Sequence, residues 1–284
     1  PISYFATSLF FRYNTPIMKK WFALCRLEII RSLEWRAETL LWVILDIFPT
    51  LVFAIVWFAI FRDKPTIANF SFSQLVGYYL AIQVILAMTE NHFDERWVEY
   101  VRYSKIDQYF IKPMPMPLVI LLQSLVRKFM AFLLFLLPFS VVVLVFSSLG
   151  YVQINLIPLS VLFTLLLFMV FTFALSFCLT FFVVLASFWI EEANSFGHFR
   201  WLVTSIFSGA LAPLAFYPQW LRQISKYLPF QYATATPALL ISKQQINAGV
   251  FNEFAILVSY VAVLMFLAHF FWKKAVRKYT SAGG

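Results

Sequence analysis

Long runs of apolar residues alternate with short polar segments along most of this chain. An α-helix rises about 1.5 Å per residue, so about 20 residues cross a hydrocarbon core about 30 Å thick. Runs of this order occupy residues 39–61, 72–89, 129–149, 156–189, a stretch that starts at Trp201, and 254–272. The pattern therefore predicts an all-α integral membrane protein with six transmembrane helices.

The apolar segment 208–240 is too interrupted for two further crossings. The fifth apolar run meets Pro213 after 12 residues and Pro218 soon afterwards, and proline removes a backbone donor inside a helix. We therefore expect a pair of short re-entrant half-helices between the fifth and sixth spans, on the outer side of the membrane. Such backbone is tolerated at membrane depth only where protein surrounds it.

Residues 17–38 are expected to form an amphipathic helix that lies flat on the membrane before the first crossing. The apolar side chains Phe22, Cys25, Ile29 and Leu33 recur on one face. The charged side chains Arg31, Glu34 and Glu38 lie on another face. Trp21 and Trp35 are suited to anchor this helix at the interface. An ordinary juxtamembrane segment is the alternative.

Residues 92–117 form a charged island between the second and third spans. The first half predicts a surface helix, and residues 106–112 predict a shorter one that Asp107 opens and Pro113 ends. Pro113, Pro115 and Pro117 then favour an extended, stiff connector. The segment is either a solvated loop or a docking element on which a soluble partner pushes.

Composition supports a membrane location and indicates the topology. Hydrophobic residues make up 62% of the chain and charged residues 12%, which excludes a water-soluble globule. The net charge of +9 does not indicate nucleic acid, because the basic residues gather beside the ends of the apolar runs. The N-terminus, the stretch from Arg96 to Lys128, Arg200 and the C-terminus hold 17 of the 22 lysines and arginines. By the positive-inside rule, these parts face the cytoplasm of a multi-pass protein of the cell membrane.

The predicted organisation has three parts. Residues 1–38 are a cytoplasmic N-terminal segment with the amphipathic helix. Residues 39–272 are the transmembrane domain, which includes a cytoplasmic coupling loop at 91–117 and the re-entrant hairpin at 208–240. Residues 273–284 are a cytoplasmic basic tail.

The chain offers little chemistry of its own. Its seven glycines cannot form a GxxxxGK[ST] phosphate loop, no HExxH or GxSxG occurs, and its three histidines and two cysteines are scattered. We expect no metal site and no ATPase site.

Asp46 is the one acid well inside an apolar run, so it is either paired structurally or involved with substrate or gating. An ion-driven secondary transporter, the alternative function, would need several such groups. A membrane enzyme is a weaker alternative.

Two motifs resemble the membrane subunits of ABC-2 type exporters, of the branch formerly described as a domain of unknown function. One is SKIDQYFIKPMPMP at residues 104–117, which departs from the family by having Ser104 and Lys105 where a glycine is common. The other is the hairpin sequence at 207–240. Its matching positions are Gly209, Pro213, Pro218, Trp220, Pro229, Phe230 and Pro237. The resemblance extends over most of the chain from about Met18.

This resemblance implies the permease subunit of an ATP-driven exporter. A second permease subunit, identical or paralogous, would complete the path, and separate ATPase subunits would bind ATP and Mg. The chain would bind no cofactor itself and would contact membrane lipid. The cargo moved outward would be a hydrophobic, amphipathic or cationic small molecule or a lipid-like molecule.

Two sets of residues are expected to act in this mechanism. The ATPase-coupling set has Tyr100, Tyr109 and Phe110 as anchors in a groove of the ATPase and Arg102 and Asp107 as polar contacts, with Gln108 and Lys112 beside them. The translocation path follows the second and fifth spans, where sparse polarity comes from Gln83, Thr204, Ser205 and Ser208.

Overall fold

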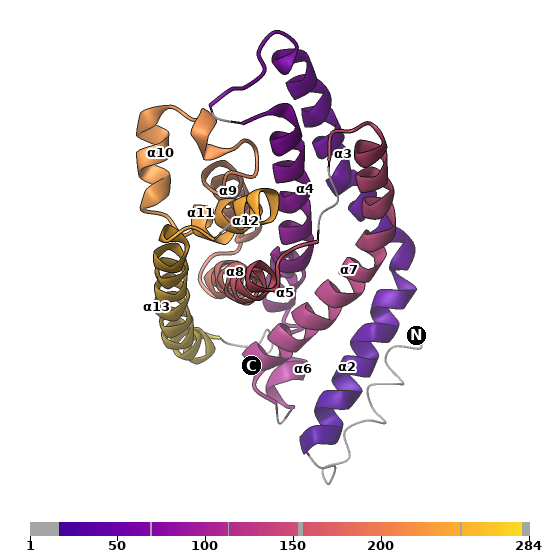
Figure 1. Cartoon of the computed structure of the whole chain (residues 1–284). Helices are drawn as coiled ribbons and strands as arrows, with labels where there is room; N and C mark the ends of the chain where they lie inside the picture. Colours follow the sequence, from indigo (N-terminus) through magenta and orange to yellow (C-terminus); the bar gives the residue numbers. More distant parts are fainter. Residues whose placement is uncertain (1–16, 69, 113, 153–155, 245, 280–284) are drawn as a thin grey trace.

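The computed structural model describes residues 17–68, 70–112, 114–152, 156–244 and 246–279, and these residues form a bundle of α-helices (Figure 1). The helices, in chain order, are α2 Ile17–Glu34, α3 Arg36–Phe61, α4 Phe72–Thr89, α5 Asp94–Arg102, α6 Asp107–Phe110, α7 Met116–Ser148, α8 Leu159–Ala186, α9 Asn194–Phe207, η1 Leu214–Phe216, α10 Gln219–Lys226, α11 Phe230–Ala233, α12 Ala235–Lys243 and α13 Gly249–Lys278.

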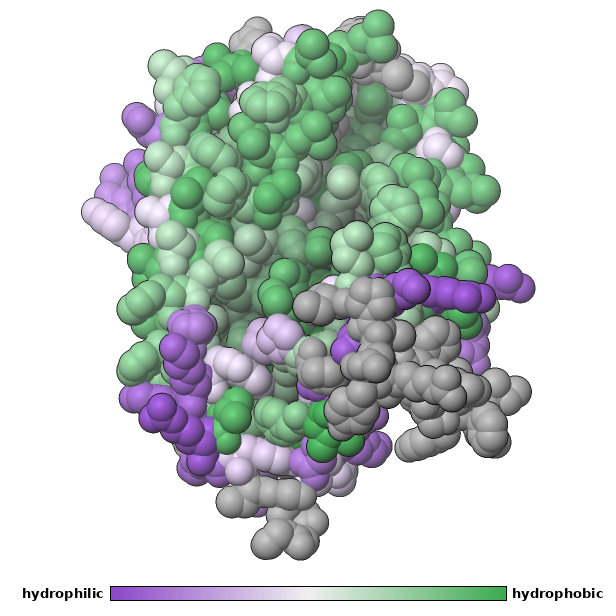
Figure 2. Space-filling model, turned by 90° about the horizontal axis from the view of Figure 1, so that it is seen from below, coloured by the Kyte–Doolittle hydropathy of each residue, from purple (hydrophilic) through white to green (hydrophobic). Residues whose placement is uncertain are grey.

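Five helices among the described residues are long and apolar enough to cross a membrane. They are α3, α4 with its continuation to Arg102, α7, α8 and α13. Large apolar side chains are exposed along α3, α7 and α8, and hydrophobic residues cover much of the face in Figure 2. Because water would not favour such a surface, this exterior is suited to lipid.

The expected fifth span is shorter than a full crossing. Its helix, α9, begins at Asn194, before Trp201, and has 14 residues. It ends ahead of Gly209, whose φ of +81° lies in the left-handed region. A Cβ at Gly209 would also lie 2.8 Å from the Tyr78 hydroxyl. The chain thus turns back at a position where only glycine fits.

The segment after α9 folds into η1, α10, α11 and α12, which are four short helices instead of the expected pair. Pro213, Pro218 and Pro229 each immediately precede one of these helices, whereas Pro237 lies inside α12. α12 packs against α4, and α11 against α8 and α13. The Thr172 hydroxyl of α8 donates to the Ala233 carbonyl at 2.9 Å, so protein groups satisfy part of this irregular backbone.

Other helix ends differ from the sequence predictions. α7 begins at Met116 with Pro115 as its N-cap, so Pro117 lies in the first helical turn and no connector extends to that residue. Proline is tolerated there because the first-turn N–H groups have no partner within the helix. The helix therefore includes Arg127, and the predicted span 129–149 corresponds only to its later part, which ends at Ser148. α8 is shorter than residues 156–189.

The two terminal helices also have different bounds. α2 ends at Glu34, so residues 36–38 belong to α3. α2 packs beside α7 and exposes Phe22, Ile29 and Leu33. At the other end, α13 continues to Lys278, so its basic residues extend the last helix.

Candidate transport site

A cavity of about 370 Å³ lies between α3, α4, α7 and α9. All four residues predicted for the path, Gln83, Thr204, Ser205 and Ser208, line it, and so does Asp46. The structure therefore brings residues from three separate parts of the sequence to one site. The remaining wall is mostly aliphatic, with aromatic side chains from Phe53, Tyr79, Phe135 and Trp201.

The polar groups of this cavity are largely bonded within the chain. Gln83 Nε2 donates to Thr50 Oγ1 at 2.6 Å and to the Asp46 carbonyl at 3.1 Å, which joins α4 to α3. The Thr204 hydroxyl donates to the Arg200 carbonyl at 2.8 Å. Apart from the ionisable groups in its lining, the cavity thus offers apolar and aromatic surface with few free donors, an arrangement suited to molecules with a large apolar part.

Two tyrosines that the sequence analysis missed hold the segment after α9 against α4. Tyr78 donates to the Gly209 carbonyl at 2.8 Å, and Tyr79 donates to the Leu211 carbonyl at 2.9 Å. The sequence does carry a signal for them, which is two adjacent tyrosines inside an apolar run. A buried tyrosine hydroxyl usually has a hydrogen-bond partner, so such a pair indicates a contact with another segment.

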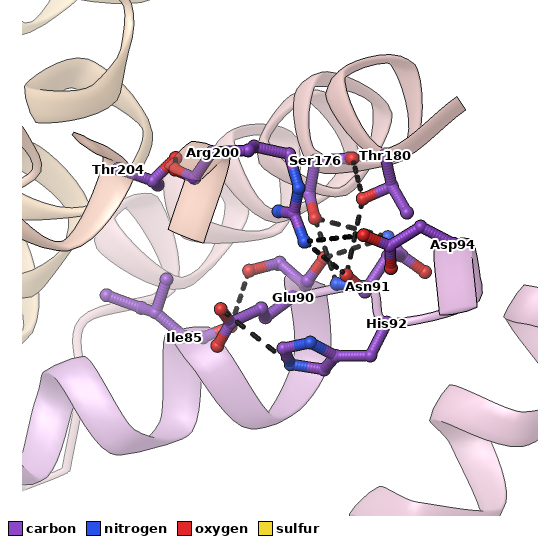
Figure 3. Close-up of polar contacts among 10 residues, drawn as sticks. Ile85, Glu90, Asn91, His92, Asp94, Ser176, Thr180, Arg200 and Thr204 are labelled. Atoms are coloured by element: carbon purple, nitrogen blue, oxygen red, sulfur yellow. Dashed lines mark hydrogen bonds and ion pairs between the residues drawn. The ribbon is translucent and has the colours of Figure 1, made fainter. Parts of the chain in front are cut away.

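Charged groups gather at one end of the cavity. Glu90, His92 and Lys128 belong to its lining. The Glu90 carboxylate lies 3.7 Å from His92 Nε2 (Figure 3). Asp46 lines the same cavity, so the acid singled out in the sequence is not isolated from other ionisable groups.

Next to this end, a buried polar network joins α5 to α9 (Figure 3). Arg200 Nη2 lies 3.6 Å from Asp94 Oδ2, and the two side chains are 11% and 7% exposed. The same guanidinium donates to the Asn91 carbonyl at 3.3 Å. The Asn91 N–H donates to Ser176 Oγ at 3.0 Å, which adds α8 to the network. Sequence reasoning used Arg200 only as a topology signal.

Close helix approach makes this network possible. A Cβ added at Gly197 would lie 2.5 Å from Asp94 Oδ2. Real Cβ atoms do not approach an oxygen so closely, so glycine at this position lets α9 pack onto α5.

The coupling residues predicted from the sequence do not share one exposed surface. Tyr100 and Tyr109 pack on the buried Trp97, at ring distances of 5.3 and 4.8 Å, and burial raises the pKa of Tyr109 above its ordinary value. Both tyrosines are half-buried in this conformation, and their role as anchors in the ATPase stays a prediction. Lys112 Nζ lies 4.8 Å above the Tyr109 ring.

Other side chains of the segment do face outward. Tyr103 is 60% exposed and Ile111 80% exposed, and Phe110, Arg102 and Gln108 are exposed beside them. Asp107 accepts a hydrogen bond from the Tyr279 hydroxyl at 2.7 Å, which ties α6 to the residue after α13. Sequence reasoning missed Tyr103 and Ile111 because helical periodicity placed the anchors on the opposite face.

The fold and the cavity define a multi-pass helical membrane protein whose cavity adjoins a polar segment at one end. Residues 47–283 match the sequence profile described as ABC-2 family transporter protein. The chain belongs to this family, whose members are membrane subunits of ABC transporters and normally lack an ATPase site. No curated protein and no solved structure is detectably similar to the chain. Within the described residues, no group of His, Cys, Asp and Glu side chains could hold a metal ion.

Proposed function

We propose that this chain is the permease subunit of an ATP-driven ABC exporter in the cell membrane. It works with separate ATPase subunits, which bind ATP and Mg, and with a second permease that is identical or paralogous. The observation that carries this proposal is the match of residues 47–283 to the ABC-2 transporter family. The ion pair between Arg200 and Asp94 supports the coupling within the chain. It connects the polar segment available to a partner with the helix that lines the cavity.

The surface available to the ATPase consists of Tyr103, Phe110 and Ile111 as apolar contacts and Arg102, Lys105 and Gln108 as polar ones. We define these six residues as the docking surface. Large exposed apolar side chains amid polar ones are typical of a protein–protein contact. The docking surface and both chain termini face the cytoplasm, in agreement with the distribution of basic residues. This topology requires that α9 and the segment after it carry the chain to the outer side, as a sixth crossing beside the five spanning helices.

Movement of the docking surface would be transmitted to the transport cavity by helices that pack against one another. α5 packs on α8 through Trp97, Phe181 and Val184, which are nearly fully buried. α5 also holds α9 through Asp94 and Arg200. A push on α5 therefore displaces α9 with its C-cap Ser208, and Thr204, Ser205 and Ser208 form one wall of the cavity.

The second permease covers the open side of the cavity, where Trp201 and Leu202 of α9 and several apolar residues of α3 are exposed. Cargo passes outward between the two subunits. The aromatic walls favour hydrophobic or amphipathic molecules, and a flat cation can lie against an aromatic face.

The proposal is tested by co-purification of the ATPase with the tagged permease from native membranes. The variant Tyr103→Ser/Ile111→Ser should lose the ATPase and vanadate-sensitive transport while its helix content stays unchanged. Tyr227→Ser is the matched control, because Tyr227 is 80% exposed and lies between α10 and α11. Full retention of the ATPase by the double variant would reject the docking surface.

A further inference from the structure

A second cavity, of about 740 Å³, lies where α2, α3, α5 and α7 meet. One wall is charged and contains Glu28, Arg31, Arg96 and Arg127. Another wall is apolar and contains Trp42, Met130, Ala131 and Leu134. The cavity shares only Ala131 with the lining of the candidate transport site, and it has a polar wall beside an apolar one.

The charged wall contains more positive than negative charge. The Glu28 carboxylate, 1% exposed, lies 3.3 Å from Arg127, 3.6 Å from Arg31 and 3.7 Å from Arg96. Three guanidinium groups around one carboxylate leave an excess of two positive charges at this wall, and Glu34 and Glu38 elsewhere in the lining balance that excess over the cavity as a whole. Arg96 also donates to the neutral Gln123 side chain at 3.0 Å, which does not offset that excess.

The three arginines have N–H groups that remain accessible from the cavity. The side chains of Arg31, Arg96 and Arg127 are 34%, 29% and 34% exposed, and each guanidinium carries five N–H donors. Because like charges at a partly desolvated site repel, an additional anion with several acceptor oxygens would stabilise the cluster. A phosphate group meets this requirement.

The position of the cavity indicates what carries the phosphate. Trp35 and Trp42, both exposed, stand where the interfacial helix α2 meets the spanning helix α3, and tryptophan favours the membrane–water interface. The apolar wall continues along α3 and α7 into the spanning region. An occupant with its phosphate on the arginines therefore has its apolar part in the hydrocarbon, as a phospholipid does.

Two carboxylates complete the site. Glu34 and Glu38 also line the cavity and are exposed. We propose that this cavity binds a phospholipid with a primary ammonium headgroup, of the phosphatidylethanolamine type. Its phosphate contacts Arg31, Arg96 and Arg127, and its ammonium group contacts Glu34 and Glu38. Its acyl chains lie along the apolar wall.

Native mass spectrometry of the purified protein, with dioleoyl phosphatidylethanolamine added, measures the bound lipid. Arg31→Gln should lower retention about tenfold, the effect of losing about 1.4 kcal/mol of binding free energy. Arg26→Gln is the matched control, because it removes the same charge from an exposed position of α2 outside the cavity, and it should retain lipid as the unaltered protein does. Equal losses in both variants would overturn the proposal.

Two further variants test which lipid headgroup the cavity prefers and whether misfolding explains a loss of bound lipid. Glu34→Gln/Glu38→Gln should remove the preference for phosphatidylethanolamine over phosphatidylglycerol, and an unchanged preference would overturn the headgroup assignment. Glu28→Gln raises the positive excess and should strengthen retention of phosphatidylglycerol, a gain that misfolding cannot produce. Displacement of the lipid by equimolar inorganic phosphate would show that the site binds free phosphate and would overturn the lipid assignment.

Discussion

Asp94 of α5 and Arg200 of α9 form a nearly buried ion pair in which Oδ2 and Nη2 lie 3.6 Å apart. The pair links a helix of the charged segment to a wall of the transport cavity. Removing one partner of a buried pair costs about 3–5 kcal/mol, because the other charge remains without compensation. Single and double substitutions of this pair should therefore differ in their effect on stability.

Asp94→Asn and Arg200→Gln should each lower the midpoint of thermal unfolding and abolish ATP-dependent transport. The double variant should recover much of the stability but little transport, because neither charge is then buried alone. The control is Glu192→Gln, which breaks the exposed pair between Arg102 and Glu192 at 3.5 Å and should cost at most about 1 kcal/mol. Full transport by the double variant would exclude a role of the pair in coupling.

Gly197→Ala should separate α9 from α5. The added methyl would overlap Asp94 Oδ2, and such overpacking typically costs about 1–3 kcal/mol. Thermal unfolding of the variant measures this cost. Gly249→Ala is the matched control, since a Cβ at Gly249 meets nothing within 4 Å. Equal stability of the two variants would contradict the close approach of the helices.

Ser205→Phe should obstruct the transport cavity. Ser205 lines the cavity, and a benzyl group there occupies space that cargo requires. We expect transport in reconstituted vesicles to fall to background while co-purification of the ATPase stays normal. Ser259→Phe, on an exposed part of α13 away from this cavity, should leave transport intact. If both variants transport normally, cargo does not pass by Ser205.

Single cysteines should report the topology. In a background with Cys25→Ser, Tyr103→Cys should react with a membrane-impermeant maleimide only after the cells are opened, whereas Tyr227→Cys should react in intact cells. Both tyrosines are well exposed, and the remaining Cys178 is buried. Labelling of Tyr103→Cys from outside would invert the proposed orientation.

The path residues predicted from the sequence line one cavity, whereas two of the predicted anchors, Tyr100 and Tyr109, are half-buried. Gln83, Thr204, Ser205 and Ser208 are polar residues in apolar helices, and burying such groups is unfavourable unless they face a partner or a cavity. Tyr100 and Tyr109 are amphipathic, so their composition fits a buried or an exposed position equally well. Their packing on Trp97 depends on how α5 and α6 fold back on each other.

The sequence by itself determined the class of protein and the approximate position of most long helices, because the length of an apolar run reflects the thickness of the bilayer. It also determined that α4 extends over Phe72–Thr89, where polar residues flank the apolar run on both sides. Only the tertiary structure decided which distant charges meet. Asp94 with Arg200, and Glu28 with Arg96 and Arg127, are paired by helix packing, and no local pattern of residues encodes such packing.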